Sequence, residues 1–240
     1  MTMSARRTLG GWAAALSLLA GCGNSTPPPK AATEDVAPQR ARGGPVPEVS
    51  AEIGALDEDA VTRTFAASLG SLQRCLEAGA RRVEYLGGSV GFALEIDQSG
   101  ALADARVSES TLGSLETEQC MLDALRKQSW PKPVGGKKGL AGKSFDFEPP
   151  SDVRAPTEWS SDRVDDTLSK LSSKIASCKE SAGGSFTATV YVDTSGKALS
   201  VGLAWSERGG EEAVECLAAL LREATYPSPG SWPAKVSFSL

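Results

Sequence analysis

The sequence repeats itself at a fixed offset, and this feature restricts the possible folds more than any other. Trp130 recurs as the aromatic Tyr226, 96 positions later (226 minus 130). Seven further residues recur at the same offset without a gap, namely Ser89, Asp97, Ser99, Gly100, Cys120, Pro131 and Pro133 as Ser185, Asp193, Ser195, Gly196, Cys216, Pro227 and Pro229. A shared offset across a turn, a cysteine and a proline-containing segment predicts two copies of one domain.

Composition and charge exclude several classes of function. The chain has a net charge of -5 and no run of Lys or Arg longer than a pair. Nucleic-acid-binding proteins concentrate basic side chains on one face to neutralise phosphates, so we expect no nucleic-acid partner. The sequence contains no histidine, which excludes serine-type catalytic triads and histidine metal sites. We expect neither a cofactor nor a bound metal ion.

The first residues are typical of an export signal. The pair Arg6-Arg7 precedes an apolar run from Gly11 to Ala20, which is shorter than the roughly 20 residues of a membrane-spanning helix. The overlapping segment Leu19-Ala20-Gly21-Cys22 resembles the lipobox of bacterial lipoproteins at every position. The resemblance implies that residues 1–21 are a signal peptide, that the Cys22 sulfur takes a diacylglycerol, and that its new amino group takes a fatty acid such as palmitate. The alternative is an ordinary secretory signal with a chance cysteine.

Residues 22–51 predict a tether between the lipid and the first domain. They are rich in Pro, Gly and small polar residues and nearly lack large apolar side chains. Such a segment cannot bury enough surface to offset its ordering entropy, so we expect a disordered, partly polyproline chain that spans on the order of 30 Å. Gly23 stands where enteric bacteria use an aspartate for inner-membrane retention, which favours the outer membrane, facing the periplasm.

Each copy predicts the order helix, strand, strand, helix, strand, in an α+β fold. In the first copy, Asp57 or Asp59 caps a helix, and Gly88 to Ile96 alternates apolar and polar residues as a half-buried strand. Asp97-Gln98-Ser99-Gly100 predicts a tight turn in preference to a calcium or catalytic site. The first helix carries one apolar stripe, which consists of Val61, Phe65, Leu69, Leu72 and Leu76.

The last strand lies at a different offset in the two copies. Phe145 and Phe147 mark it in the first copy and Val236 and Phe238 in the second, at an offset of 91 instead of 96 (236 minus 145). We attribute the shortfall to Gly135–Ser144, which matches a phosphate-binding loop incompletely and predicts a flexible, hairpin-like loop. The expected boundaries are residues 52–149 for the first domain, 150–160 for a linker and 161–240 for the second domain.

Each copy also has one cysteine in each of its two predicted helices. Cys75 would pair with Cys120, and Cys178 with Cys216. In an exported protein, an even number of cysteines that repeats by copy predicts two intradomain disulfides. The alternative, a redox couple, usually needs the proximity of a Cys-x-x-Cys motif.

The combination of residues between Val61 and Phe147 matches a known family. The match consists of Arg74-Cys75, Gly88-x-Val90-x-Phe92-x-Leu94-x-Ile96, Gly100, Cys120, Trp130-Pro131-x-Pro133, Gly136 and Phe145-x-Phe147. On these residues the first copy resembles the AgmX/PglI C-terminal domain family, which is similar to the TonB C-terminal fold, and the second copy is a diverged member. The resemblance implies a noncatalytic adaptor in an envelope assembly for motility or transport. It would bind an unidentified envelope protein by offering a sheet edge to a partner strand.

Three further hypotheses concern particular residues or ligands. Trp130 and Tyr226 form either an aromatic binding rim or a cap on the core where a helix ends. The carboxylates Asp97, Glu95 and Asp104 would suit a glycan hydrolase if two of them lay ~5 to 9 Å apart in a cleft. The third hypothesis is binding to peptidoglycan or another polysaccharide. The sequence leaves the oligomeric state open.

Overall fold

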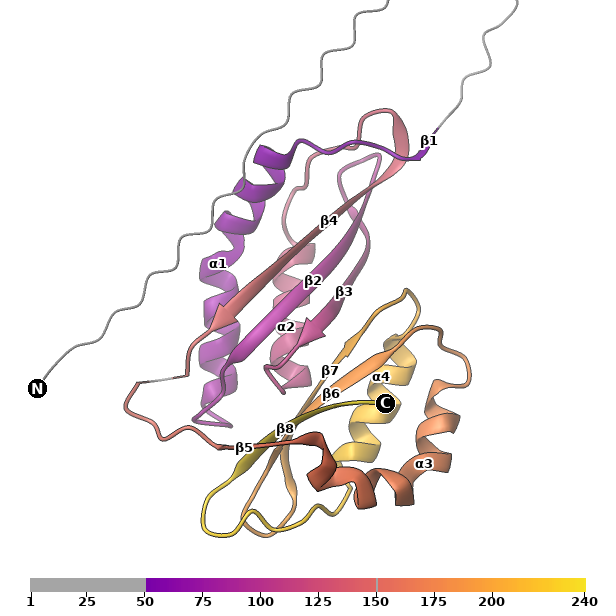
Figure 1. Cartoon of the computed structure of the whole chain (residues 1–240). Coiled ribbons are helices and arrows are strands. Elements are labelled where there is room, and N and C mark those ends of the chain that lie inside the picture. Colours follow the sequence, from indigo (N-terminus) through magenta and orange to yellow (C-terminus); the bar gives the residue numbers. More distant parts are fainter. Residues whose placement is uncertain (1–50, 150) are drawn as a thin grey trace, which may run out of the picture. The chain divides into compact units, whose positions relative to one another are not determined.

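Each repeat folds into a four-stranded mixed sheet with two long helices packed against it (Figure 1). The computed structural model describes residues 51–149 and 151–240, which belong to one compact unit. The predicted signal peptide, Cys22 and nearly all of the predicted tether lie outside the described residues. The α+β class and the two tandem domains are confirmed.

The two repeats share one order of elements. The first repeat contains β1 (Ala51–Ile53), α1 (Glu58–Ala80), β2 (Gly88–Asp97), β3 (Leu102–Ser110), α2 (Leu115–Arg126) and β4 (Gly136–Phe147). The second repeat contains β5 (Thr157–Trp159), the 3-10 turn η1 (Ser161–Val164), α3 (Asp165–Lys179), β6 (Phe186–Val192), β7 (Ala198–Trp205), α4 (Glu211–Arg222) and β8 (Ala234–Ser239). The predicted order is therefore confirmed, with one additional short strand before the first helix of each repeat.

These additional strands complete the two sheets. The strand orders are β1-β4-β2-β3 and β5-β8-β6-β7, and β1 and β5 run parallel to β4 and β8. Each has only 3 residues, which is too short to show an alternating pattern in the sequence. Strand β5 lies within the segment 150–160 that we predicted as a linker, so the second domain begins earlier than expected.

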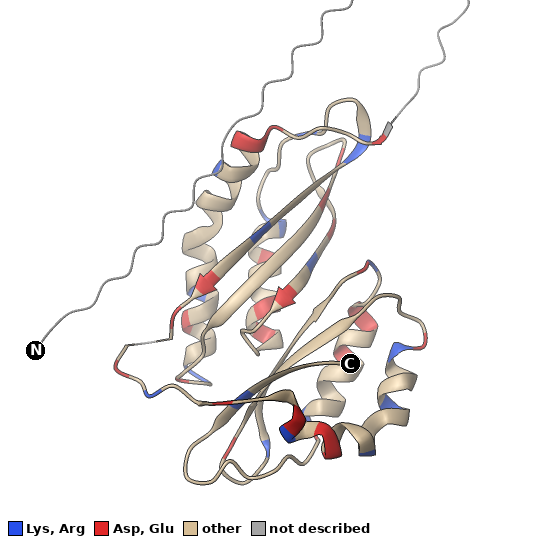
Figure 2. Cartoon of the chain, in the orientation of Figure 1, with Lys and Arg blue, Asp and Glu red and all other residues tan. Residues whose placement is uncertain are grey.

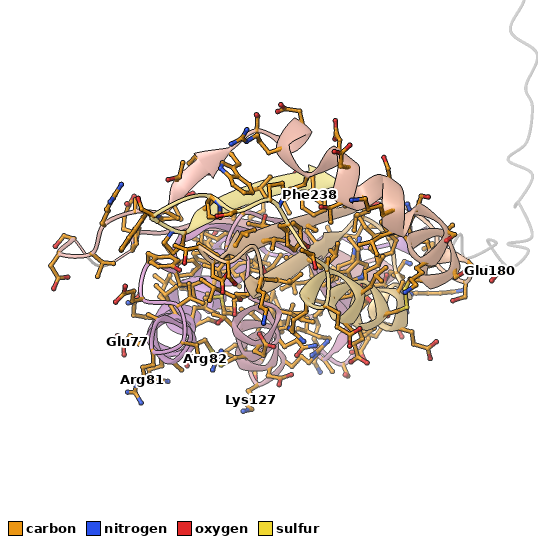
Figure 3. All side chains as sticks on the ribbon, turned by 90° about the horizontal axis from the view of Figure 1, so that it is seen from below. Glu77, Arg81, Arg82, Lys127, Glu180 and Phe238 are labelled. Atoms are coloured by element: carbon orange, nitrogen blue, oxygen red, sulfur yellow. A yellow bond between two sulfur atoms is a disulfide. The ribbon has the colours of Figure 1, made fainter. Side chains whose placement is uncertain are left out.

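Helix α1 begins at a capping aspartate and buries one stripe. The Asp57 carboxylate accepts a hydrogen bond from the Ala60 amide at 2.9 Å, which satisfies a free amide of the first turn. The core-facing stripe includes Ser68 and Leu72, whereas Leu69 is 46% exposed and the prediction for it was wrong. Ser68 is accommodated because its hydroxyl donates to the Thr64 carbonyl at 2.9 Å. At the far end of α1, Glu77, Arg81 and Arg82 project away from the interior (Figure 3).

Both hairpins turn through the predicted Asp-x-Ser-Gly segment. Asp97 Oδ1 accepts hydrogen bonds from the amides of Ser99 at 2.8 Å and Ala101 at 3.0 Å, and Gly100 has a φ of 90°. Asp193 makes the equivalent contacts in the second repeat, to the amides of Ser195 and Lys197. The glycine supplies the positive φ of the turn, and the aspartate binds the amides of its own turn. These two roles explain the motif without a bound ligand.

The glycine-lysine segment Gly135–Ser144 forms most of strand β4, so its prediction as a flexible loop was wrong. A Cβ atom on Gly136 would overlap the backbone of Gly54, and one on Gly139 would lie 2.5 Å from the Leu56 side chain. The glycines therefore let the chain between β1 and α1 lie directly on the strand.

The register also corrects the offset of the last strand. Gly139 pairs with Ile96 in the first repeat, and Ala234 pairs with Val192, the equivalent residue, in the second. The offset is therefore 95 (234 minus 139), one position from the common 96. By the same offset, Phe145 corresponds to Leu240, and no loop is missing from the second repeat.

The two predicted disulfides are confirmed. Cys75 bonds to Cys120 with 5.8 Å between the Cα atoms, and Cys178 bonds to Cys216 with 5.6 Å. Each bond joins the first helix of a repeat to its second helix. The cross-link therefore connects the two helices that cover one face of each sheet.

Candidate binding surfaces

The sheet of the second repeat is buried on both faces. Val190 and Val192 of β6 point to one face, Thr189 and Tyr191 point to the other, and none of them is more than 1% exposed. The first repeat covers the Thr189 face with β3 and the start of α2, which contact β6 and β7. The two repeats therefore share one continuous core.

A buried carboxylate joins the repeats at this contact. Glu118 of α2 accepts a hydrogen bond from the Ser110 hydroxyl at 2.7 Å and another from the backbone amide of Leu203 on β7 at 3.1 Å. Glu118 is 1% exposed. Removal from water raises the pKa of Glu118 to about 7, although the hydrogen bonds from Ser110 and Leu203 act in the opposite direction.

This carboxyl should make the stability of the protein depend on pH. Because its pKa is about 7 in the folded chain and 4.5 ordinarily, the folded chain binds more protons than the unfolded chain between these values. The free energy of unfolding should therefore fall as the pH rises from 5 to 8, by at most about 3 kcal/mol from this group. Urea unfolding should show a smaller decrease for Glu118→Gln. Equal decreases in the two proteins would show that Glu118 does not cause this pH dependence.

A second set of polar contacts joins the repeats at Gly87. The Tyr191 hydroxyl and the Lys235 ammonium both donate hydrogen bonds to the Gly87 carbonyl, at 3.1 and 2.9 Å. Burial lowers the pKa of Lys235 and raises that of Tyr191. Tyr191 and Lys235 thus both have a hydrogen-bond partner, as buried polar groups usually do.

The carboxylates that suggested a glycan hydrolase lie in a network of ion pairs and a turn. Glu95 contacts Lys138 at 3.2 Å and Arg208 of the second repeat at 3.1 Å. Asp104 contacts Arg106 at 2.6 Å and lies 3.9 Å from Arg208. Basic and acidic residues are interspersed over both repeats (Figure 2). The Asp97 carboxylate accepts a hydrogen bond from the Ser99 amide in the hairpin turn. Each carboxylate thus has a structural partner, and Arg208 connects the two repeats.

The aromatic residues Trp130 and Tyr226 lie in the core and do not form an exposed rim. They are 4% and 3% exposed. Trp130 Nε1 donates to the Leu125 carbonyl at 3.2 Å, and the Tyr226 hydroxyl donates to the Leu221 carbonyl at 2.9 Å. Both side chains therefore cap the last turn of the second helix of their repeat, which was the alternative interpretation.

Strand β4 has a long edge that pairs with no other strand of the described chain. Strand β1 pairs with Gly136–Lys138 alone, which leaves Gly139 to Phe147 without a neighbour on that side. In the second repeat, β5 pairs with Ala234–Val236 of β8 and leaves the last three residues of β8 unpaired on that side. The other edge strands, β3 and β7, contact each other where the repeats meet. The unpaired part of β4 is thus longer than that of β8, and it takes no part in the contact between β3 and β7.

An apolar groove accompanies this edge. It has a volume of about 250 Å³ and lies between the start of α1 and β4, where its apolar lining includes Leu56, Val61 and Ala141. On the other face of the strand, Leu140 is 54% exposed and Ile53 is 55% exposed. Apolar surface therefore flanks the unpaired edge on both faces.

Comparisons with known proteins do not assign this chain to a family. No family model, no curated protein and no solved structure matches it. Within the described ranges, no group of three or more Asp, Glu or Cys residues could hold a metal ion. No helix of those ranges is long and apolar enough to cross a membrane.

Proposed function

We propose that this protein is a noncatalytic, lipid-anchored adaptor of the bacterial envelope that binds an envelope protein by strand addition to β4. The unpaired edge from Gly139 to Phe147 carries the proposal. The lipobox at Cys22 and the resemblance to the AgmX/PglI and TonB C-terminal domains support it from the sequence. Anchoring would be in the outer membrane, facing the periplasm, and fractionation of cells that carry a tagged protein tests this location.

An edge of this kind is unusual unless something pairs with it. Natural proteins protect exposed edge strands with prolines, bulges, charges or short length. The unpaired part of β4 contains no proline, its pairing with β2 shows no register shift, and its charged residues are Lys143 and Asp146 alone. A strand from a partner would gain main-chain hydrogen bonds there without any chemistry.

The register identifies the backbone groups that would pair with the partner. The Lys138 carbonyl accepts a hydrogen bond from the Gly54 amide at 2.7 Å and therefore points to the outer edge. Because backbone groups alternate between the two edges of a strand, those of Leu140, Gly142, Ser144 and Asp146 point the same way. Side chains of an added strand would lie alternately in the apolar groove and beside the exposed Leu140.

Proline at an outward-pointing position should abolish binding without disrupting the sheet. Ser144→Pro removes an amide that points away from β2, so the fold should be retained and capture of the partner from envelope extracts should be lost. The matched control is Ser239→Pro at the equivalent position of β8 (144 plus 95). We expect this variant to capture the partner as the unmodified protein does. Undiminished capture by a folded Ser144→Pro protein would count against strand addition.

A further inference from the structure

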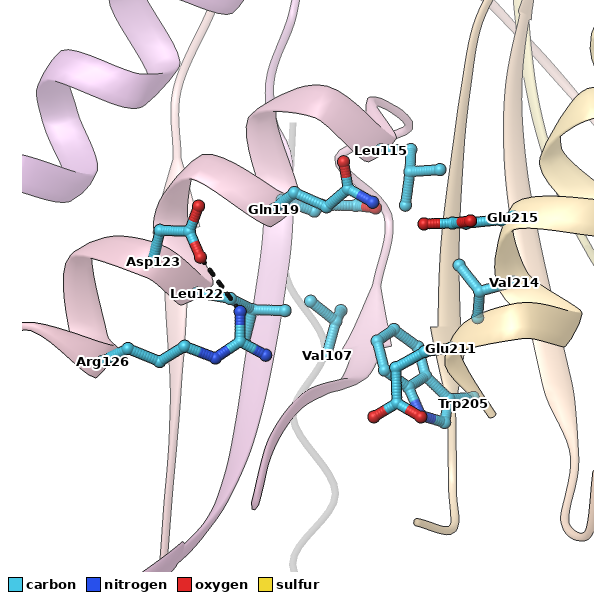
Figure 4. Close-up of a pocket in the computed structure, with 11 residues that line it drawn as sticks. Val107, Leu115, Gln119, Leu122, Asp123, Arg126, Trp205, Glu211, Val214 and Glu215 are labelled. Atoms are coloured by element: carbon cyan, nitrogen blue, oxygen red, sulfur yellow. Dashed lines mark hydrogen bonds and ion pairs between the residues drawn. The ribbon is translucent and has the colours of Figure 1, made fainter. Parts of the chain in front are cut away.

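The groove between α2 and α4 has a volume of about 270 Å³ and is explained without a ligand (Figure 4). Arg126 in its lining already contacts Asp123 at 3.0 Å. Glu211 and Glu215 of α4 are exposed to water, as carboxylates usually are. The unpaired edge of β4 differs, because its outward-pointing backbone groups have no hydrogen-bond partner within the described chain. This edge is therefore the surface that a ligand would complete.

Lys143 lies at the centre of the unpaired segment from Gly139 to Phe147. It is opposite Phe92 on β2, so its side chain lies on the face of the sheet that the helices cover. There its Nζ lies 6.0 Å from the centre of the Phe145 ring. Lys143 is exposed and forms no ion pair with any residue of 51–149 or 151–240. The edge therefore presents an unpaired positive charge at its centre.

The apolar groove of this edge lies two residues before Lys143. Ala141 points to the same face as Lys143, because side chains alternate along a strand. It lines the groove together with Leu56 and Val61. Glu58, at the start of α1, lines the groove as well and would repel a second carboxylate there. A strand beside β4 would thus meet apolar surface opposite Ala141 and a positive charge opposite Lys143.

A second copy of this chain is poorly suited to the edge. Antiparallel pairing of two β4 strands over the whole unpaired segment places Gly139 opposite Phe147 of the second copy, and Lys143 opposite the second Lys143. Like charges directly opposite each other destabilise a strand pair. A shifted register avoids this contact but pairs fewer residues of the edge. The charge that disfavours a second copy favours a strand with an acidic residue at this position.

We propose that the partner strand runs antiparallel to β4, with an acidic residue opposite Lys143 and a large apolar residue two positions later, opposite Ala141. The inference rests on the proposed strand addition and specifies the sequence that the edge selects. Main-chain hydrogen bonds would hold any strand, whereas these two side chains would decide which strand is held. We expect the antiparallel direction because antiparallel pairs are slightly more stable per residue.

The test titrates the full mature lipoprotein, in detergent micelles, with a peptide that matches the segment Gly139 to Phe147 in length. The peptide has glutamate at its fifth position, leucine at its seventh and threonine at the others. The backbone amide resonances of Leu140 and Ser144, which point outward, are recorded by NMR. We expect saturable shifts of both resonances, because the added strand forms hydrogen bonds with these amides.

Two peptides of the same composition are the controls. Exchange of the glutamate and the leucine places the acid in the groove beside Glu58 and the leucine beside Lys143. Reversal of the sequence keeps the glutamate opposite Lys143 and moves the leucine to Phe145, away from the groove. We expect each control to bind about 10-fold more weakly, because the first loses the ion pair and the burial of leucine, and the second loses the burial.

The variant Lys143→Glu separates the ion pair from the folding of the sheet. Lys143 is exposed, so the variant should fold as the unmodified protein does. It should bind a peptide with lysine at the fifth position about 10-fold more tightly than the peptide with glutamate there. This result would reverse the preference of the unmodified protein, which a purely structural role of Lys143 would not do.

The proposal is overturned if either control peptide binds as well as the first peptide, or if Lys143→Glu leaves the preference unchanged. It is also overturned if the unmodified protein forms a dimer that Ser144→Pro abolishes. These results would leave strand addition itself intact. If none of the peptides shifts the resonances of Leu140 and Ser144, strand addition at this edge is contradicted as well.

Discussion

Gly202→Ala should lower the free energy of unfolding by roughly 1 to 3 kcal/mol, the usual effect of overpacking a core. Gly202 lies on the face of β7 that packs against the first repeat. A Cβ atom there would lie 2.5 Å from Glu118 Oε1, 2.6 Å from the Ser114 nitrogen and 2.7 Å from the Gly113 Cα. Two of these atoms belong to the backbone and cannot move without displacing the start of α2. The added methyl group should therefore force the two repeats apart.

Gly91→Ala is the matched control, because Gly91 lies on β2, in the sheet of the first repeat. Its Cβ atom would meet the Ser144 Oγ at 3.0 Å, and a serine side chain can rotate away. Urea unfolding should show the larger loss for Gly202→Ala, and the Leu203 amide should exchange with solvent faster in that variant. Equal stability of the two variants, with unchanged exchange at Leu203, would contradict the packing of the repeats.

Removal of the first disulfide should have the largest effect on stability. The double variant Cys75→Ala, Cys120→Ala opens a loop with a sequence separation of 45 residues. On the chain-entropy model this lowers the free energy of unfolding by up to about 4 kcal/mol. The equivalent change in the second repeat, at Cys178 and Cys216, opens a separation of 38 and should cost nearly as much.

Denaturant unfolding of both cysteine variants measures this effect. Each cross-link acts mainly on the unfolded chain, whose conformational entropy it reduces. A loss below about 1 kcal/mol in both variants would show that the bonds contribute little to stability.

The sequence predicted the features that depend on local chemistry. The Asp-x-Ser-Gly turns, the alternating hairpin strands and the cysteine pairs each follow from a few neighbouring residues or from the repeat itself. Strand β4 was mistaken for a loop because glycine and lysine are uncommon in strands. In this fold, glycine at Gly136 and Gly139 makes room for Gly54 and Leu56, and this distant contact overrides the local preference.

The surfaces between the repeats could not be read from the sequence. Thr189 and Tyr191 alternate with valines as a solvent-facing side of a strand would, yet both are buried. Glu118 lies in the first turn of α2, where an acidic residue already suits the helix dipole, so nothing marked it as an interface residue. Arg208 lies in a loop, and its contacts with Glu95 and Asp104 arise only when the repeats pack. Contacts between domains leave no periodic pattern in either domain.

Photo-crosslinking in the native envelope tests most directly whether β4 takes a partner strand. A crosslinking amino acid would replace Leu140, which is 54% exposed beside the unpaired edge, or Leu199, which is 45% exposed in the second repeat. We predict one crosslinked envelope protein from position 140, loss of that product when Ser144→Pro is added, and no such product from position 199. A product from position 140 that persists with Ser144→Pro, or none from position 140, would contradict strand addition at this edge.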